Sequence, residues 1–247
     1  MVFPFKQKVR IQVKKRESVN APLRHLLLIQ KVAQLMLTYQ KWLNCVFGSS
    51  VNQAFSSSKL DKLDAETICK YFYTTLLNSG SDLLRFSDKQ VNNGLYLMFG
   101  ERANIVDALK EPSISAQART AAIRAIKILY TDCFDLRSRP VLSHLDERGA
   151  SSINSICYML WDVTPITVWG NKGDCEYFDL SLEVLEFALY LKNPACIESA
   201  LHGLGHMGSC GTNQRVTRII DNWIRQTQIS HPQLLEYAVR AQQGYIL

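Results

Sequence analysis

A repeated helix start near the C-terminus is the feature that most constrains the fold of this chain. The segments NPACIESAL and HPQLLEYAV align without a gap, so that Pro194 pairs with Pro232 and Glu198 pairs with Glu236, 38 positions later. Proline at the first position of a helix gives up only an N–H group that has no partner within the helix. Both segments are therefore predicted to begin helices.

Another helical stretch precedes each of these two starts. The first stretch places Leu182, Leu185 and Leu189 at three- and four-residue spacing, and the second extends over residues 216–224. Such spacing indicates one apolar stripe along a helix. The unit is therefore helix, turn, helix, and a period of about 40 residues is typical of arrays in which each helix pair buries its apolar face against its neighbours.

On these two units, residues 179–247 resemble the HEAT-like repeats of α-solenoid proteins. The resemblance implies an all-α fold, a right-handed α-α superhelix of stacked helical hairpins. HEAT repeats commonly carry a proline in or near the first helix, whereas this chain places it at the start of the second, so HEAT-like is the appropriate description. We expect residues 21–247 to form the helical repeat domain and residues 1–20 to form a basic N-terminal arm.

The positive charge of the chain is concentrated at its N-terminus. The net charge is +6, and residues 1–20 contain six basic side chains and one acidic side chain, which leaves the remainder close to neutral. A nearly neutral body argues against a basic groove for nonspecific phosphate binding. Lys14, Lys15 and Arg16 are the candidate polyanion-binding residues, and a nucleic-acid-binding protein that uses this arm with Arg215 and Arg218 is one alternative function.

The cysteine pattern and the hydropathy predict a cytoplasmic protein. The seven cysteines are widely spaced and include no C-x-x-C pair, so neither a disulfide framework nor a zinc ribbon is expected. The first thirty residues do not have the pattern of a signal peptide. Because no stretch reaches the roughly 18 apolar residues that a membrane span needs, no membrane contact is expected.

Further helices are predicted along the rest of the chain. Caps and apolar periodicity place them at 22–47, from Asp64 to about Gly80, from Ser87 or Asp88 to about Gly100, from Ser115 to Tyr130, from Pro140 to Glu147, and at 151–163. The segment TPITVWGNKGD, residues 164–174, is predicted to be an irregular connection with an exposed Trp169. Residues 8–14 alternate polar and apolar side chains, which favours an extended arm, and the serine-rich 52–58 is predicted to be a surface loop or a linker.

One row of polar side chains is the candidate for chemistry. Glu198, His202, His206 and Cys210 follow one another at four-residue intervals, and helical geometry places them opposite the apolar stripe. The favoured interpretation is a polar outward or concave face of a repeat. The alternatives are contact with a partner and a metal site, in which the two histidines share an ion and Glu198 or Cys210 adds a third ligand. Since Gly203 follows the first histidine, the motif of a zinc protease is absent.

Other enzymatic signals are weak. The sequence contains no glycine-rich phosphate loop and no G-x-S-x-G motif. Asp162 is a candidate buried carboxylate, although a hydrogen bond at a helix end explains it equally well. We therefore predict no catalytic residues and no cofactor, and the sequence favours a non-enzymatic protein.

The favoured function is binding to another macromolecule through the helical-repeat surface. Another protein is the expected partner, and the action is that of a scaffold, an adaptor or a stoichiometric inhibitor such as an immunity protein against a toxin. A nucleic-acid-binding protein and a metal-dependent enzyme that uses Glu198, His202 and His206 are the alternatives. The predicted partner-binding residues are Glu198, His202, His206, Glu236, Arg240 and, at one edge, Trp169.

Overall fold

The computed structural model describes residues 39–48, 63–100, 105–171, 175–208, 214–228 and 231–246. Within these ranges the chain forms helices and helical turns and contains no β-strand, which confirms the all-α class. The chain divides into two compact units, Met1–Lys41 and Trp42–Leu247. Of the first, only residues 39–41 are described, and they are helical. The predicted arm, with its strand-like residues 8–14 and with Lys14, Lys15 and Arg16, lies outside the described residues.

The helices at the start of the second unit begin where local side chains cap them. Helix α2 covers Ala65–Leu77, and the Asp64 carboxylate accepts a hydrogen bond from the N–H of Thr67 at 2.7 Å. After the short α3, Ser79–Asp82, helix α4 covers Asp88–Phe99 behind a capping box of Ser87 and Gln90. The starts predicted at Asp64 and Ser87 are therefore confirmed.

The middle of the chain forms a long helical run with a change of pitch. The run contains α5 (Ala116–Arg124), α6 (Ile126–Leu129), a π-helical turn (Tyr130–Phe134) and α7 (Asp135–Arg137). Ser115 caps α5, as predicted. Two 3-10 turns flank the run, Val106–Lys110 and Ser143–Leu145. The helix predicted from Pro140 to Glu147 is wrong, because only the second of these turns forms there.

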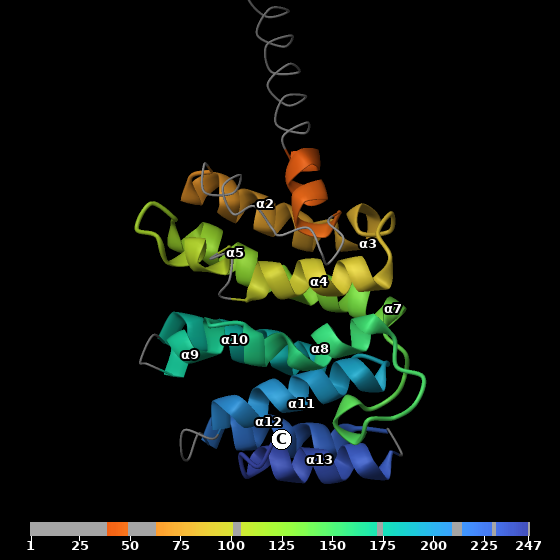
Figure 1. The fold of residues 1–247 in the computed structure, drawn as a ribbon. Coiled ribbons are helices and arrows are strands. Elements are labelled where there is room, and N and C mark those ends of the chain that lie inside the picture. The colour runs from red at the N-terminus through yellow and green to blue at the C-terminus, as the bar shows by residue number, and fades with distance from the viewer. Residues whose placement is uncertain are drawn as a thin grey trace, which may run out of the picture. The chain divides into compact units, whose positions relative to one another are not determined.

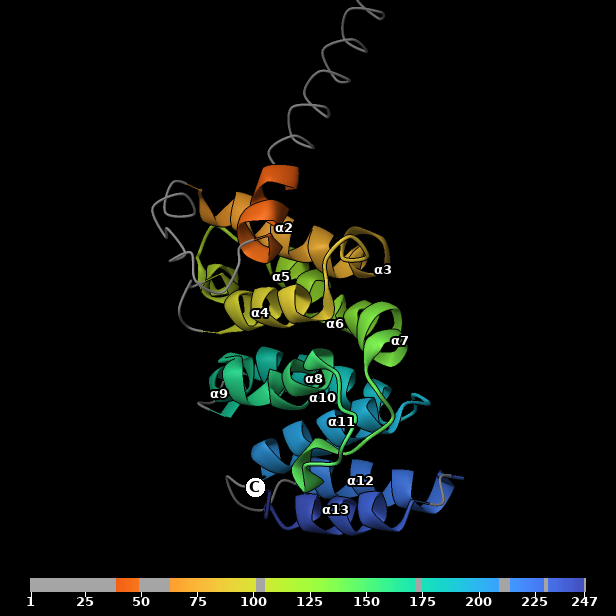
Figure 2. The same ribbon diagram turned by 45° about the vertical axis from the view of Figure 1, so that its right-hand side comes forward.

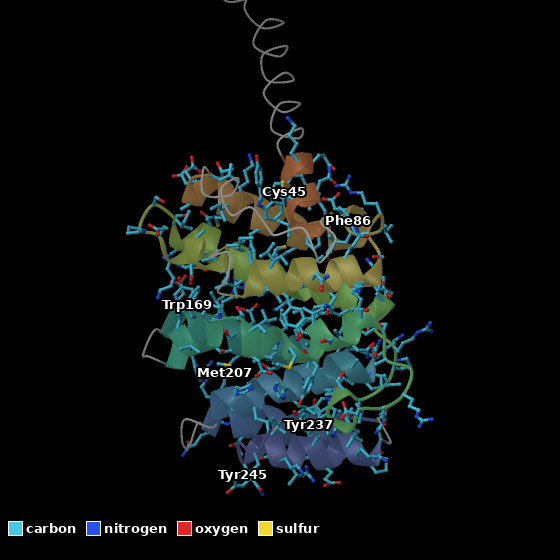
Figure 3. All side chains as sticks on the ribbon, viewed as in Figure 1. Cys45, Phe86, Trp169, Met207, Tyr237 and Tyr245 are labelled. Carbon is cyan, nitrogen blue, oxygen red and sulfur yellow. The ribbon has the colours of Figure 1, made fainter. Side chains whose placement is uncertain are left out.

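Two more helices follow. Helix α8 covers Ser152–Val163, in agreement with the prediction for 151–163. Helix α9 covers Ile166–Asn171, so the prediction of an irregular connection with an exposed Trp169 is wrong. Trp169, labelled in Figure 3, is only 8% exposed, because its ring packs against Tyr177 at a centroid distance of 5.0 Å and lies beneath the Lys110 ammonium.

The C-terminal helices form two consecutive pairs, as the repeated segments predicted. The helices are α10 (Cys175–Ala188), α11 (Pro194–Gly208), α12 (Gln214–Gln226) and α13 (Pro232–Gln242). Pro194 and Pro232 each begin the second helix of a pair. Within the unit Trp42–Leu247, α11 contacts α8 and α10 on one side and α12 and α13 on the other (Figure 1 and Figure 2).

The position of α11 between two layers decides its burial. Every residue from Ala195 to Gly205 is buried, whereas α13 buries Leu234, Tyr237 and Ala238 and exposes its opposite face. At the end of α13, Tyr245 is 71% exposed and projects from the molecule in Figure 3. None of the helices that the structure describes has the length and apolar character needed to cross a lipid bilayer.

Candidate metal centre

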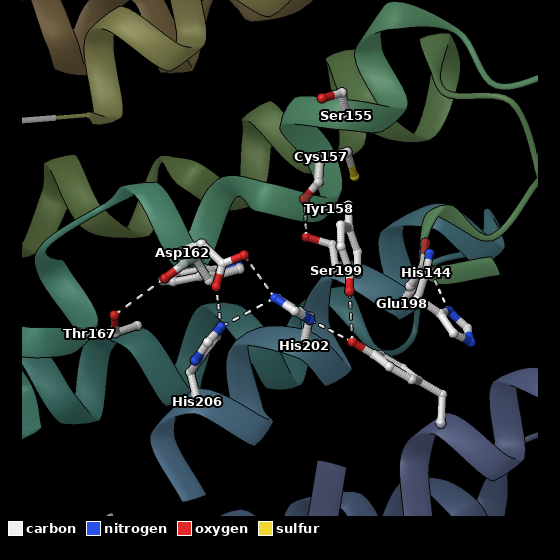
Figure 4. A network of polar contacts seen from close by, with 12 residues as sticks. His144, Ser155, Cys157, Tyr158, Asp162, Thr167, Glu198, Ser199, His202 and His206 are labelled. Carbon is white, nitrogen blue, oxygen red and sulfur yellow. Dashed lines mark hydrogen bonds and ion pairs between the residues drawn. The ribbon is translucent and has the colours of Figure 1, made fainter. Parts of the chain in front are cut away.

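Three side chains from two helices converge on one point. Asp162 lies in the last turn of α8, and His202 and His206 lie one helical turn apart on α11. The Nε2 atom of His202 is 2.9 Å from Oδ2 of Asp162 and 3.2 Å from Nε2 of His206. The Nε2 atom of His206 also contacts Oδ1 of Asp162 (Figure 4). The pair of histidines singled out in the sequence is therefore joined by a carboxylate from 40 positions earlier in the chain.

The predicted outward position of the polar row is wrong for its first two members. Glu198 is fully buried, and only 2% of the His202 side chain is exposed, because the packing of α8 and α13 against α11 covers the face that carries them. His206 lies nearer the end of α11, and 40% of its side chain is exposed. Cys210 lies outside the described residues.

A glycine allows α8 to approach α11 closely. A Cβ atom at Gly203 would lie 2.7 Å from Cγ of Trp161 and 2.7 Å from Cδ2 of Leu185, which is closer than real Cβ contacts. The missing side chain therefore lets the Trp161 ring lie directly on the backbone of α11. Because Asp162 is the next residue of α8, this close approach also brings its carboxylate to His202.

The carboxylate of the cluster is ionised. Burial opposes ionisation of Asp162, but hydrogen bonds with His202 and His206 outweigh it and hold the pKa of this carboxyl well below its usual range. The centre therefore offers one anionic oxygen ligand beside two imidazole nitrogens. Imidazole and carboxylate are common ligands of divalent transition metals in proteins.

Two of the distances in this cluster match the spacing of ligands around a single ion. One ligand atom from each residue can be chosen so that all three lie within 4.8 Å of one another. Bonds of about 2.0–2.1 Å to a common ion place neighbouring ligand atoms about 2.9–3.3 Å apart in tetrahedral or octahedral geometry. The distances of 2.9 and 3.2 Å from His202 Nε2 fall in this interval. Asp162 and His206 are partly exposed, so this side of the centre is accessible from the surface.

A second layer of side chains orients His202. Its Nδ1 atom lies 2.5 Å from the hydroxyl of Tyr237 on α13, and that hydroxyl lies 3.3 Å from the hydroxyl of Tyr158 on α8. Burial raises the pKa of Tyr237 and of Tyr158, so both phenols keep their protons at neutral pH. A partner on the far nitrogen of a metal-ligating histidine fixes the orientation of the ring.

Glu198 supports this second layer and is not one of the three converging residues. Its carboxylate accepts hydrogen bonds from the backbone N–H groups of Ser143 and His144, both at 2.9 Å, and lies 2.6 Å from Nδ1 of His144. The His144 ring stacks on the ring of Tyr237 at 4.2 Å. Figure 4 shows Glu198 beside His144 and away from Asp162 and His206. The hypothesis that Glu198 is a metal ligand is therefore wrong.

The other residues predicted to bind a partner do not belong to this centre. Glu236 and Arg240 are exposed on α13 and form an ion pair with each other at 2.7 Å. Trp169 is buried on α9. Arg215, a candidate for nucleic-acid binding, pairs with Asp179, while Arg218 is exposed.

Sequence reasoning missed the third member of the cluster and the two tyrosines. Asp162 stood out only as a carboxylate beside Trp161, and no short-range pattern connects it with His202. Tyr158 and Tyr237 carry no motif at all. Comparison with protein-family models, with curated proteins and with solved structures finds no match for this chain.

Proposed function

We propose that this protein binds a divalent transition-metal ion through Asp162, His202 and His206. The observation that carries the proposal is the convergence of two imidazole nitrogens and an ionised carboxylate within 4.8 Å of one another, with Nε2 of His202 2.9 Å from Asp162 and 3.2 Å from His206. Two histidines and one carboxylate are the ligand set of several Zn²⁺ and non-haem Fe²⁺ centres. This set replaces the row of Glu198, His202 and His206 as the basis for a metal-dependent function.

The accessible side of the centre supports a reactive role for the ion. Among the described residues three supply ligands, and water or an exogenous ligand completes the coordination of an ion held in this way. An ion with such an open position polarises a bound carbonyl or phosphoryl group, or lowers the pKa of bound water. Metal-assisted hydrolysis is the reaction class that this arrangement fits.

Metal titration of the stripped protein tests the proposal. Protein treated with a chelator and dialysed is titrated with Zn²⁺ by calorimetry, and the spectrum of the Co²⁺ complex reports the coordination. Asp162→Asn and His206→Gln are expected to weaken Zn²⁺ binding by more than about 100-fold, since loss of an outer partner alone costs about 10–100-fold.

Two variants outside the cluster serve as matched controls. His231 lies just before α13, and Glu236 is exposed on α13. Neither residue belongs to the cluster of Asp162, His202 and His206. His231→Gln and Glu236→Gln should bind Zn²⁺ as the wild type does. Equal Zn²⁺ affinities for the wild type, Asp162→Asn and His206→Gln would overturn the proposal.

A second candidate function is protein binding by a HEAT-like, right-handed stack of helix pairs, as a scaffold or a stoichiometric inhibitor. The exposed face of α13 favours it, because Val239 remains 47% exposed between the charged Glu236 and Arg240. Such a surface suits a protein partner with an apolar contact and a polar rim. Glu198, His202 and Trp169, being buried, no longer belong to the proposed surface.

Quantitative pull-down from native cells tests this second function. Val239→Glu on α13 is expected to abolish capture of a specific partner, whereas Leu77→Glu, at a position of 41% exposure on α2, is expected to retain it. Retention of every captured protein by Val239→Glu would exclude α13 as the binding face.

A further inference from the structure

A network of three buried side chains lies at the contact between α8 and α11. The Nε1 atom of Trp161 on α8 lies 2.8 Å from the hydroxyl of Tyr130, and that hydroxyl lies 2.7 Å from the hydroxyl of Ser199 on α11. The Ser199 hydroxyl in turn contacts the backbone oxygen of Cys157 on α8, as Figure 4 shows. No more than 1% of the surface of Trp161, Tyr130 or Ser199 is exposed, so protein groups must satisfy their polar atoms.

The two ends of the network fix the direction of every hydrogen bond in it. The indole N–H of Trp161 can only donate, so the oxygen of Tyr130 accepts from it. A backbone carbonyl can only accept, so the Ser199 hydroxyl gives its one proton to Cys157, and its oxygen accepts from Tyr130. Burial raises the pKa of Tyr130 well above its usual range, so the phenol keeps the proton that it donates. The direction of these bonds is therefore independent of the protonation of the histidines.

Trp161 connects this network with the metal centre. It directly precedes Asp162 in the last turn of α8. Its ring lies on the backbone of Gly203, where a Cβ atom would be 2.7 Å from Cγ of the indole. The ring is thus held by two contacts, the packing on α11 and the hydrogen bond to Tyr130. Any shift of the backbone of Trp161 also shifts Asp162.

Tyr130 is itself held in the long helical run in the middle of the chain. It is the first residue of the π-helical turn, in which the N–H of Asp135 donates to its carbonyl oxygen. Its ring packs edge-on against Phe134 at a centroid distance of 5.3 Å. Such turns are rare and are frequent at functional sites. The Tyr130 hydroxyl therefore joins this turn to a residue 31 positions later in the chain.

We propose that Tyr130 is a positioning residue of the metal centre, which acts through Trp161 to hold the carboxylate of Asp162 in place. The inference rests on the proposed metal-binding function. Ligands of a functional centre must be held within about 0.5 Å of their productive positions. Without the Tyr130 hydroxyl, the buried N–H of Trp161 loses its acceptor, and a shift of the ring toward another acceptor moves Asp162. Tyr130 acts on the ion only through these two residues.

Tyr130→Phe tests the proposal, because it removes the hydroxyl and keeps the ring against Phe134. This variant is expected to bind Zn²⁺ about 10-fold more weakly than the wild type in calorimetric titration, as is typical of residues outside the ligand set. The spectrum of its Co²⁺ complex should differ from that of the wild type, because one ligand has moved. In the metal-free protein, the indole N–H signal of Trp161 should move upfield in a nitrogen–proton NMR spectrum, since a hydrogen bond is lost.

Two control variants remove a buried hydroxyl and leave the indole bonded. Ser199→Ala keeps the bond between Trp161 and Tyr130. Tyr177→Phe removes a buried hydroxyl on α10 that donates to the backbone oxygen of Leu109 at 3.3 Å. Whatever their effect on the melting temperature, both should keep the Zn²⁺ affinity and the Co²⁺ spectrum of the wild type. Equal weakening of Zn²⁺ binding in Tyr177→Phe would show a general effect of stability and would overturn the positioning role.

A second change tests the same hydrogen bond from its donor side. Replacement of Trp161 by benzothienylalanine exchanges the indole N–H for sulfur and keeps the size of the ring, while Tyr130 keeps its bond to Ser199. It should weaken Zn²⁺ binding as much as Tyr130→Phe does, and it decides the question if Tyr130→Phe does not fold. Wild-type Zn²⁺ affinity in either variant would refute the positioning role and leave the metal site standing. Absence of Zn²⁺ binding by the wild type would refute the metal site and this inference together.

Discussion

At the scale of single residues, the informative feature of this protein is the set of polar side chains buried in α11. Glu198 and His202 have almost no exposed surface, and each has hydrogen-bond partners for its polar atoms. A buried polar group without partners is costly, so these residues are tolerated only because α8, α13 and residues 142–147 supply partners. Their roles therefore follow from their surroundings rather than from their type.

Replacement of Glu198 by glutamine is expected to destabilise the fold. The amide of Glu198→Gln cannot accept hydrogen bonds from Ser143, from His144 and from the His144 ring at once, so at least one buried donor loses its partner. The expected loss is about 1–3 kcal/mol of unfolding free energy, measured by urea unfolding. Glu236→Gln, on the exposed face, should change stability by less than about 0.5 kcal/mol. Equal effects of the two variants would contradict the anchoring role of Glu198.

A buried thiol predicts a specific loss of stability in alkali. Burial raises the pKa of Cys133 from 9.0 to about 12. Above pH 9 the unfolded chain loses the thiol proton, whereas the folded protein keeps it. The contribution of this thiol to the free energy of unfolding is therefore complete below pH 9 and falls as pH rises, by at most about 1.4 kcal/mol per pH unit. Urea unfolding of the wild type and of Cys133→Ala between pH 8 and 10.5 measures the difference between their free energies of unfolding. This difference should become smaller as pH rises. A constant difference would show that the thiol ionises equally in both states.

At the scale of elements, helix starts are the best-predicted part of the fold. Asp64, Ser87 and Ser115 cap the helices that the sequence assigned to them, and both prolines begin α11 and α13. Capping depends on residues within one turn, so the sequence contains the whole signal. Helix α9 was missed because Pro165 before it and Gly170 within it resemble a loop, whereas packing of Trp169 against Tyr177 favours the helix.

The contact between α8 and α11 predicts a difference between two glycines of the same helix. Gly203→Ala should cost about 1–3 kcal/mol, because its Cβ meets Trp161 and Leu185 at 2.7 Å and the helices must separate. It should also weaken Zn²⁺ binding, since Asp162 moves with Trp161. At Gly208 a Cβ lies 3.4 Å from Val216, an ordinary contact, so Gly208→Ala should be close to neutral. Thermal unfolding and Zn²⁺ titration of both variants measure these effects.

At the scale of the whole molecule, the candidate metal centre joins parts of the chain that are distant in sequence. Asp162 is contributed by α8, the two histidines by α11, and Tyr237 by α13, while Glu198 and His144 attach residues 142–147 to the same network. An ion that binds these groups in the folded protein and not in the unfolded chain stabilises the fold.

Zn²⁺ is therefore expected to raise the melting temperature. At a free concentration 100 times the dissociation constant, the stabilisation is about 2.7 kcal/mol. For a protein of this size that corresponds to roughly 5–10 °C, measurable by calorimetry with and without chelator. His206→Gln should show no such shift, because it lacks one ligand and retains the fold at a partly exposed position. A shift of equal size in this variant would place the bound ion elsewhere.

The sequence by itself determined the helical class, the starts of α11 and α13, and the alignment of His202 with His206 on one helical face. These features depend on neighbours within a few residues and on the period of the helix. Only the tertiary structure decided that this face is buried, that Asp162 joins the histidines in place of Glu198, and that Tyr237 orients His202. The reason is that these contacts arise where helices from separate stretches of the chain pack together, and no local pattern specifies which faces meet.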